Sequence, residues 1–195
     1  MFGGGETRYE TMGEYTDLMS FDFQDHKPYD LENNIDPEIH FYQNIDLNCD
    51  YYSEDRFNAE VNMEGFSVIH FNSRSLYSNF SKIKHYLQQF KNRFSVIAIS
   101  ETWLRNDNEF QGVLDGYEMF WQNRVNKRAG GVALFVETHF KCKVIEKMTT
   151  VIDNLMECIT IEINVEKSRN ILVSCIYRTP GSCIDQFNKS ISQLQ

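Results

Sequence analysis

From about residue 66 the sequence shows regular apolar patterns, and strand-like and helix-like patterns alternate first. Residues 66–71 predict a strand, and residues 94–99 predict a second strand with apolar side chains on both alternating faces. Between them, one face of a predicted helix carries Phe80, Ile83, Tyr86, Leu87 and Phe90. A strand that is apolar on both faces is typical of a sheet covered on both sides. The order strand, helix, strand therefore predicts a parallel crossover within an α/β layer.

Shorter strands, separated by polar turns, are predicted over residues 117–122, 131–136 and 143–146. A predicted hairpin follows them. Over residues 158–165 apolar and polar residues alternate, which predicts a half-buried strand, whereas the more continuously apolar residues 171–177 predict a fully buried one. A final helix is predicted from about Ser182, with Ile184, Phe187, Ile191 and Leu194 on one face.

The first 65 residues differ from the rest in composition. They hold 16 of the 28 acidic residues and 3 of the 19 basic ones, and Pro28 and Pro37 interrupt them. Such a segment cannot easily bury enough apolar surface to offset the entropy cost of ordering it. We therefore predict a mostly disordered acidic leader over residues 1–65 and a mildly basic folded domain over residues 66–195. Aromatic residues in the acidic leader suit short motifs that dock on a protein partner.

Cysteine spacing and hydropathy bear on the compartment. The five cysteines form no C-x-x-C pair, so the sequence favours neither a zinc site nor a disulfide framework. Reduced thiols are typical of an intracellular protein, nuclear or cytoplasmic. The N-terminus lacks a signal-peptide pattern, and no apolar run approaches the roughly 20 residues that a membrane-spanning helix needs. We expect no membrane association.

Polar residues follow three of the predicted strands at their ends, where a rigid sheet presents side chains to solvent. The Glu101 carboxylate is a suitable ligand for Mg²⁺, which takes one or two protein carboxylates together with water and substrate phosphate. Asn72 can orient a phosphate oxygen, and the Tyr177 hydroxyl can donate to one as charge develops. Each residue taken alone also has a structural interpretation, respectively as a cap, a turn former and an aromatic at the edge of the core.

Four segments in order carry a resemblance to a known family. They are residues 69–76, residues 97–104 with Ser-Glu-Thr-Trp-Leu, residues 128–136 with a Gly-Gly pair, and residues 176–180. Together they resemble the endonuclease/exonuclease/phosphatase superfamily, and more narrowly the apurinic-type endonuclease domain of non-LTR (LINE-type) retrotransposon polyproteins. The resemblance covers about residues 66–195.

The resemblance implies a four-layered α/β/β/α sandwich and Mg²⁺-dependent hydrolysis of a phosphodiester in DNA. It implies that Glu101 binds the metal, that Asn72 lies beside the metal and the phosphate, and that Tyr177 lies near the scissile phosphate. Arg74 stands where many repair enzymes of the family have an acidic residue. The basic residues expected to contact the DNA backbone are Arg74, Arg124, Lys127, Arg128 and Arg178.

Two parts of the family pattern are missing. The sequence has neither the Gly-Asp-Phe-Asn motif nor the later Asp-His pair. We therefore expect the N-terminal half of such a domain, with only part of the sandwich, weak Mg²⁺ binding and no significant nuclease activity. Because the family builds its second sheet largely from later sequence, the first sheet is expected to expose an apolar inner face, which favours self-association.

Two alternative functions stay open from the sequence. One is a non-enzymatic interaction protein that docks partners through its acidic leader. The other is a phosphoesterase of the same superfamily that acts on a lipid or inositol phosphate. The sequence motifs around Asn72 and Glu101 favour the retroelement endonucleases of the superfamily. The acidic leader disfavours binding to an anionic membrane surface, and so disfavours a lipid substrate.

Overall fold

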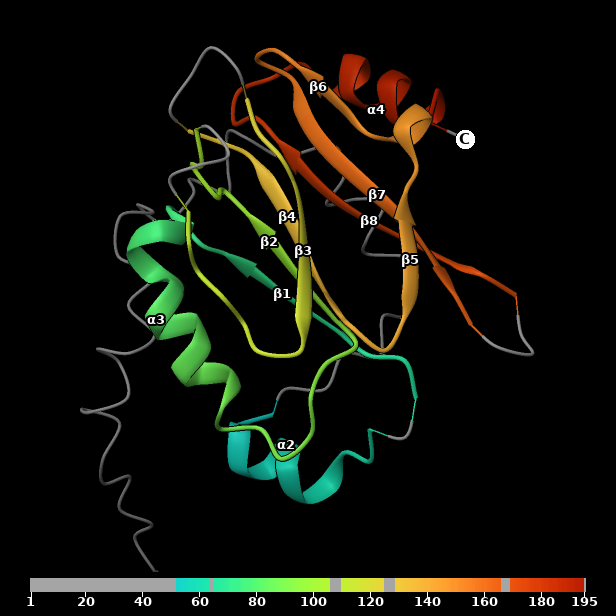
Figure 1. Cartoon of the computed structure of the whole chain (residues 1–195). Helices are drawn as coiled ribbons and strands as arrows, with labels where there is room; N and C mark the ends of the chain where they lie inside the picture. Colours follow the sequence, from blue (N-terminus) through green and yellow to red (C-terminus); the bar gives the residue numbers. More distant parts are fainter. Residues whose placement is uncertain (1–51, 64, 106–109, 125–128, 166–168, 195) are drawn as a thin grey trace, which may run out of the picture. The chain divides into compact units, whose positions relative to one another are not determined.

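Figure 1 shows the computed structural model of the chain, which describes residues 52–63, 65–105, 110–124, 129–165 and 169–194. From Glu54 onwards the chain belongs to one compact unit. The elements are α2 (Glu54–Glu60), β1 (Val68–Asn72), α3 (Leu76–Leu87), β2 (Val96–Ser100), β3 (Tyr117–Gln122), β4 (Val132–Glu137), β5 (Lys141–Val144), the 3-10 helix η1 (Glu146–Met148), β6 (Thr150–Ile152), β7 (Met156–Asn164), β8 (Ile171–Arg178) and α4 (Ile184–Ser192).

The first sheet has the strand order β1-β2-β4-β3. β1 pairs with β2 in parallel, from Val68 opposite Val96 to Asn72 opposite Ser100, and α3 makes the crossover between them. The predicted parallel crossover is confirmed. The other two pairings are antiparallel. All five residues of β2 and the first five of β4 are buried, as the apolar pattern of both strands predicts.

The second sheet is centred on β7, which pairs with β5, β6 and β8, each time antiparallel. The predicted hairpin is present, but the burial of its two strands is the reverse of the prediction. β7 is buried over most of its length, whereas burial alternates along β8 and Leu172 is 53% exposed. The reason is position, because β7 is the central strand of its sheet and even its polar residue Thr160 is fully buried.

The two sheets pack face to face around one core. Val96, Leu134 and Val136 of the first sheet meet Ile159 and Ile161 of the second in a single apolar cluster. The expectation that the first sheet exposes its inner face is therefore wrong, because β7 and β8 of the same chain cover it. Self-association through that face loses its basis, since these side chains are already removed from water.

Helices cover the outer faces of both sheets (Figure 1). α3 buries Leu76 and Ile83, and its Phe80 ring stacks on Phe135 of β4 with 6.1 Å between centroids. α4 lies on the second sheet, where Phe187 and Ile191 pack against the cluster that contains Met156. The layers are α/β/β/α, so the predicted sandwich class is confirmed. No helix in the described ranges is both long and apolar enough to cross a membrane.

Helix α2 corrects the predicted boundary of the acidic leader. Residues 54–60 were expected to be disordered, but they form a helix whose Phe57 ring meets Phe90 edge to face, 5.4 Å between centroids. The Asn58 side chain donates to Gln89 O at 2.7 Å and accepts from Lys91 N at 2.8 Å. These contacts attach α2 to the segment after α3. Residues 1–51, with the docking motifs predicted in them, lie outside the described residues.

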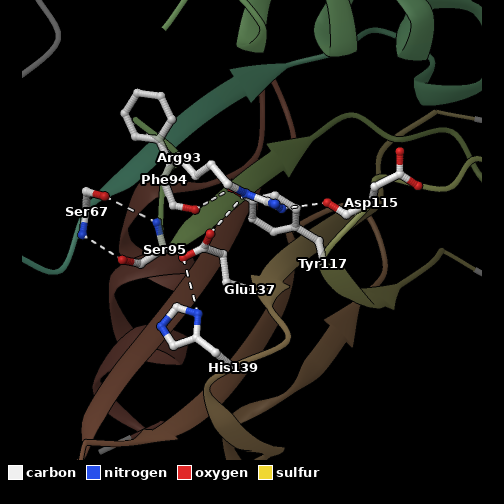
Figure 2. A network of polar contacts seen from close by, with 8 residues as sticks. All are labelled: Ser67, Arg93, Phe94, Ser95, Asp115, Tyr117, Glu137 and His139. Carbon is white, nitrogen blue, oxygen red and sulfur yellow. Dashed lines mark hydrogen bonds and ion pairs between the residues drawn. The ribbon is translucent and has the colours of Figure 1, made fainter. Parts of the chain in front are cut away.

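A polar network closes one end of the first sheet (Figure 2). Arg93 pairs with Glu137 at 3.0 Å and lies over the Tyr117 ring, 4.6 Å from its centroid. The Tyr117 hydroxyl donates to Phe94 O at 2.7 Å, and burial of the ring raises the pKa of that hydroxyl. The network therefore joins the starts of β2 and β3 to the end of β4. The candidate chemistry lies at the other end.

Candidate functional site

Six strand ends meet at the opposite end of the sandwich, which we call the rim. In the first sheet Ser100, at the end of β2, lies opposite both Asn72 and Val132. In the second sheet the end of β8 lies beside the start of β7, with Arg178 opposite Met156. A hydrogen bond across the sheets, from the Arg124 guanidinium after β3 to Thr179 after β8 at 2.7 Å, brings the two sets of ends together.

The rim brings together the three residues predicted from strand ends. Asn72 Nδ2 donates to Glu101 Oε1 at 3.1 Å. Tyr177 arrives from the second sheet, and burial, followed by the charge of Glu101 and a hydrogen bond to it, raises the pKa of its hydroxyl. A raised pKa keeps the phenol neutral, so Tyr177 is a hydrogen-bond donor at physiological pH. A carboxylate, an amide and a phenol are thus in contact.

Glu101 is held in an unusual backbone conformation. Its φ is 53°, and the nearby Arg74, Ser75 and Trp103 also have positive φ. Hydrogen bonds from Ser75 N to Glu101 O at 2.9 Å and from Trp103 N to Gly130 O at 2.9 Å fix the segment from both sides. A non-glycine residue at positive φ costs about 1–3 kcal/mol and persists only where the surroundings determine it. The rim therefore carries backbone strain at its candidate carboxylate.

A buried ion pair stabilises the segment that contains Glu101. The Arg124 guanidinium pairs with the carboxylate of Glu157 on β7, and Nε lies 2.6 Å from Oε1. Gly131 N donates to the second carboxylate oxygen at 3.4 Å, and Gly131 O accepts from Thr102 N at 3.2 Å. A series of hydrogen bonds thus connects the Glu157 carboxylate through Gly131 to Thr102, the residue directly after Glu101.

Burial of Arg124 overturns one of the expectations for DNA contact. Its side chain is 5% exposed, and both Glu157 and Thr179 bind its guanidinium. It is therefore unable to bind a solvent-exposed phosphate without breaking that pair. Glu157 was not among the predicted site residues. Its position at the start of an apolar strand was a usable signal, because a charged residue that is buried there needs a buried partner.

The other predicted basic residues lie in different settings. Arg74 is exposed and next to the site, with its backbone N–H donating to Asn72 Oδ1 at 3.4 Å. Arg178 turns toward α4, where Nη1 donates to Ser182 O at 3.2 Å and the guanidinium lies 6.0 Å from the centre of the Phe187 ring. Lys127 and Arg128 lie outside the described residues. Among the described basic residues expected to contact DNA, Arg74 is the exposed one, and it contacts Asn72.

The rim residues supply oxygen ligands that suit a Mg²⁺ ion whose remaining ligands are water and phosphate. Such an ion takes one or two carboxylates, and Glu101 supplies one beside the amide of Asn72. Within the described ranges, no group of three or more His, Cys, Asp or Glu side chains is arranged to hold a metal. The rim therefore fits an ion that the ligand helps to hold, and does not form a complete protein cage.

Comparisons with known proteins find similarity among solved structures. No family model matches the chain, and no curated protein matches it. A solved structure of the 3′ phosphatase NExo from Neisseria, a variant bound to a product DNA hairpin, aligns with a TM-score of 0.36 and 13% identity. The alignment covers 55% of this chain and 40% of that chain.

Proposed function

We propose that the rim binds a phosphodiester of DNA and supports its Mg²⁺-dependent hydrolysis, as in an endonuclease of the non-LTR retroelement type, at a very low rate. The observation that carries the proposal is the contact of the Glu101 carboxylate with the Asn72 amide and with the Tyr177 hydroxyl. These groups come from both sheets and meet at one rim. Their sequence setting, with the four family-like segments, supports the same substrate.

Each of the three side chains has a defined task in this proposal. Glu101 would hold the Mg²⁺ ion, which when bound offsets negative charge on the phosphate. Asn72 holds the carboxylate in place through its amide N–H at 3.1 Å. Tyr177 keeps its proton because its pKa is raised, and its hydroxyl would turn from the Glu101 carboxylate to donate to a phosphate oxygen as negative charge develops there.

The low rate follows from what the described residues bring to the rim. No histidine in those ranges has a hydrogen bond or ion pair with Asn72, Glu101 or Tyr177, and the neighbouring carboxylate of Glu157 is committed to Arg124. Without a general base to take the proton of the attacking water, a rate loss of roughly 10²- to 10⁴-fold is expected. Binding is therefore the more sensitive readout.

The test measures binding of a fluorescent DNA duplex with and without Mg²⁺, for the wild-type chain, Glu101→Gln and Glu118→Gln. Glu118 is an exposed carboxylate on β3 and serves as the control. Mg²⁺ should strengthen binding by the wild type and by Glu118→Gln, but not by Glu101→Gln. Without Mg²⁺, Glu101→Gln should bind more tightly than the wild type, because a negative charge has been removed from the phosphate site.

A plasmid-nicking assay with Mg²⁺ completes the test. We expect at most slow nicking, present with Glu118→Gln and absent with Glu101→Gln. Equal Mg²⁺ dependence of binding in the wild type and in Glu101→Gln, or nicking that survives Glu101→Gln, would show that the rim is not the phosphodiester site.

A further inference from the structure

A pocket of about 290 Å³ lies next to the rim, and nothing in the proposed hydrolysis uses it. It begins two residues after Glu101. We call it the aromatic pocket, and it is lined by Tyr77, Trp103, Leu104, Arg105 and Phe110. Three aromatic rings and one cation around a small pocket are unusual on a protein surface. Clusters of exposed large apolar side chains mark binding sites.

The walls of the aromatic pocket are held in place by the fold. Phe110 packs edge to face on Phe80, with 5.1 Å between centroids, and Phe80 in turn stacks on Phe135 of the buried strand β4. Trp103 is tied through its backbone N–H to Gly130 O. A ligand that enters the pocket therefore meets a Phe110 ring that is already ordered, which lowers the entropy cost of binding.

Three features of the aromatic pocket are unusual, and two of them, both at Trp103, are unfavourable for stability. Tyr77, in the first turn of α3, leaves 73% of its surface exposed. Trp103 has φ 54°, and its indole N–H is buried without an acceptor among the described residues. Positive φ and an unpaired buried donor are both unfavourable, and such features gather where function requires a given geometry. The rings are thus placed for contact with a ligand.

We propose that the aromatic pocket receives an unpaired nucleobase of the DNA strand whose phosphodiester lies at the rim, which makes single-stranded or locally unpaired DNA the preferred substrate. A base has a flat π face that stacks on tyrosine, tryptophan and phenylalanine rings whatever its identity. Arg105 is exposed at the pocket and supplies positive charge toward the adjoining phosphates. The proposal rests on the rim as the phosphodiester site, since that site places the strand beside the pocket.

The experiment uses the full chain and a fluorescein-labelled oligothymidylate of about eight nucleotides, a length within the usual range for one single-strand site. Binding is followed by anisotropy at low salt, in EDTA. An abasic strand of equal length keeps the phosphates and removes the bases. The protein variants are Tyr77→Ala, Arg105→Ala and, as a control, Val113→Ala, whose side chain is 67% exposed and does not line the pocket.

Tyr77→Ala should weaken oligothymidylate binding about 5- to 150-fold, the loss expected for one stacked base. The abasic strand should bind the wild type as weakly as oligothymidylate binds Tyr77→Ala, and Val113→Ala should bind like the wild type. Arg105→Ala should weaken both strands alike, because it acts on phosphates. Because Tyr77 is mostly exposed, its replacement leaves the core intact.

Three outcomes would overturn the proposal: no oligothymidylate binding by the wild type, equal binding of the abasic strand, or an unchanged affinity in Tyr77→Ala. Self-association of the chain that Tyr77→Ala abolishes, without base-dependent binding, would instead assign the pocket to a second copy. Since the assay contains no Mg²⁺ and needs no hydrolysis, base-dependent binding that persists in Glu101→Gln would support the pocket even if the proposed hydrolysis failed.

Discussion

Arg124 and Glu157 form an ion pair that joins the two sheets inside the molecule. The Glu157 side chain is fully buried, and the Arg124 Nε lies 2.6 Å from its Oε1. The same carboxylate also accepts from Gly131 N, so one buried charge links a β7 side chain to the loop that holds the segment after Glu101. The geometry of the rim depends on this pair.

Glu157→Gln should therefore be strongly destabilising. Removal of the negative charge leaves the Arg124 guanidinium buried and unpaired, which costs about 3–5 kcal/mol. Urea unfolding measures the effect as a lower midpoint at an unchanged slope. The double variant Arg124→Met with Glu157→Leu should recover much of the loss, since it removes both charges.

Glu162→Gln is the matched control for that experiment. Glu162 lies on the same strand and pairs with Lys143 at 2.7 Å on the surface, where the lysine side chain is 70% exposed. Its replacement should hardly change stability, because exposed pairs contribute little. If Glu157→Gln were as mild as Glu162→Gln, the buried pair would have no structural role.

Two glycines with similar backbone angles should respond differently to alanine. Gly131 has φ +86°, and an added Cβ would overlap the Thr102 hydroxyl. Gly181 has φ +75° and open space around it. Gly181→Ala should cost about 1–2 kcal/mol from the left-handed conformation alone, and Gly131→Ala clearly more, because the clash adds to that strain. Equal losses in urea unfolding would argue against close packing at Gly131.

The attachment of α2 can be tested at Asn58, whose side chain makes two hydrogen bonds to the segment after α3. Asn58→Ala should lower stability by about 1 kcal/mol, even though alanine is the better helix former. Asn62→Ala is the control, since Asn62 is exposed and follows the helix. A thermal unfolding midpoint that is identical in the two variants would mean that α2 does not belong to the folded unit.

The buried thiol of Cys175 predicts a pH dependence. Burial raises the pKa of Cys175 from 9.0 to about 12. Because the folded pKa exceeds the unfolded one, the contribution to stability is fully present below pH 9.0 and is lost as the pH rises toward 12. Over that window the wild type should lose about 1.4 kcal/mol per pH unit more than Cys175→Ala.

The measurement for Cys175 is chemical unfolding of both proteins at several values of pH within that window. Tyrosine and lysine titration affects the two proteins alike and cancels in the difference. Parallel pH profiles would show that the thiol ionises as easily in the folded chain as in the unfolded one.

Half of the rim was predictable from local pattern. Asn72 and Glu101 follow two apolar strands joined by one amphipathic helix, and the carboxyl ends of neighbouring parallel strands lie at the same edge of a sheet. Their proximity therefore follows from periodicity and from the short crossover. Tyr177 belongs to the other sheet, so residue spacing alone did not place it, and the family-like segments were needed to expect it nearby.

The burial of β7 and β8 shows where pattern fails. The alternating strand is the buried one, and the more apolar strand leaves Leu172 half exposed. Burial depends on the neighbours of a strand, and β7 has partners along both edges and α4 over part of its outer face. A sequence window contains no information about those neighbours.

The sequence by itself determined the α/β class, the parallel crossover, most strands and the candidate roles of Asn72 and Glu101, because hydrophobic period and strand-end polarity are local properties. Only the tertiary structure decided that one chain covers both faces of its first sheet and that an aromatic pocket adjoins the rim. It also decided that the Arg124 guanidinium pairs with Glu157 and is not available to DNA. The inner face and the ion pair join residues of different sheets, which packing between the sheets brings into contact. The aromatic pocket joins α3 to the segment between β2 and β3.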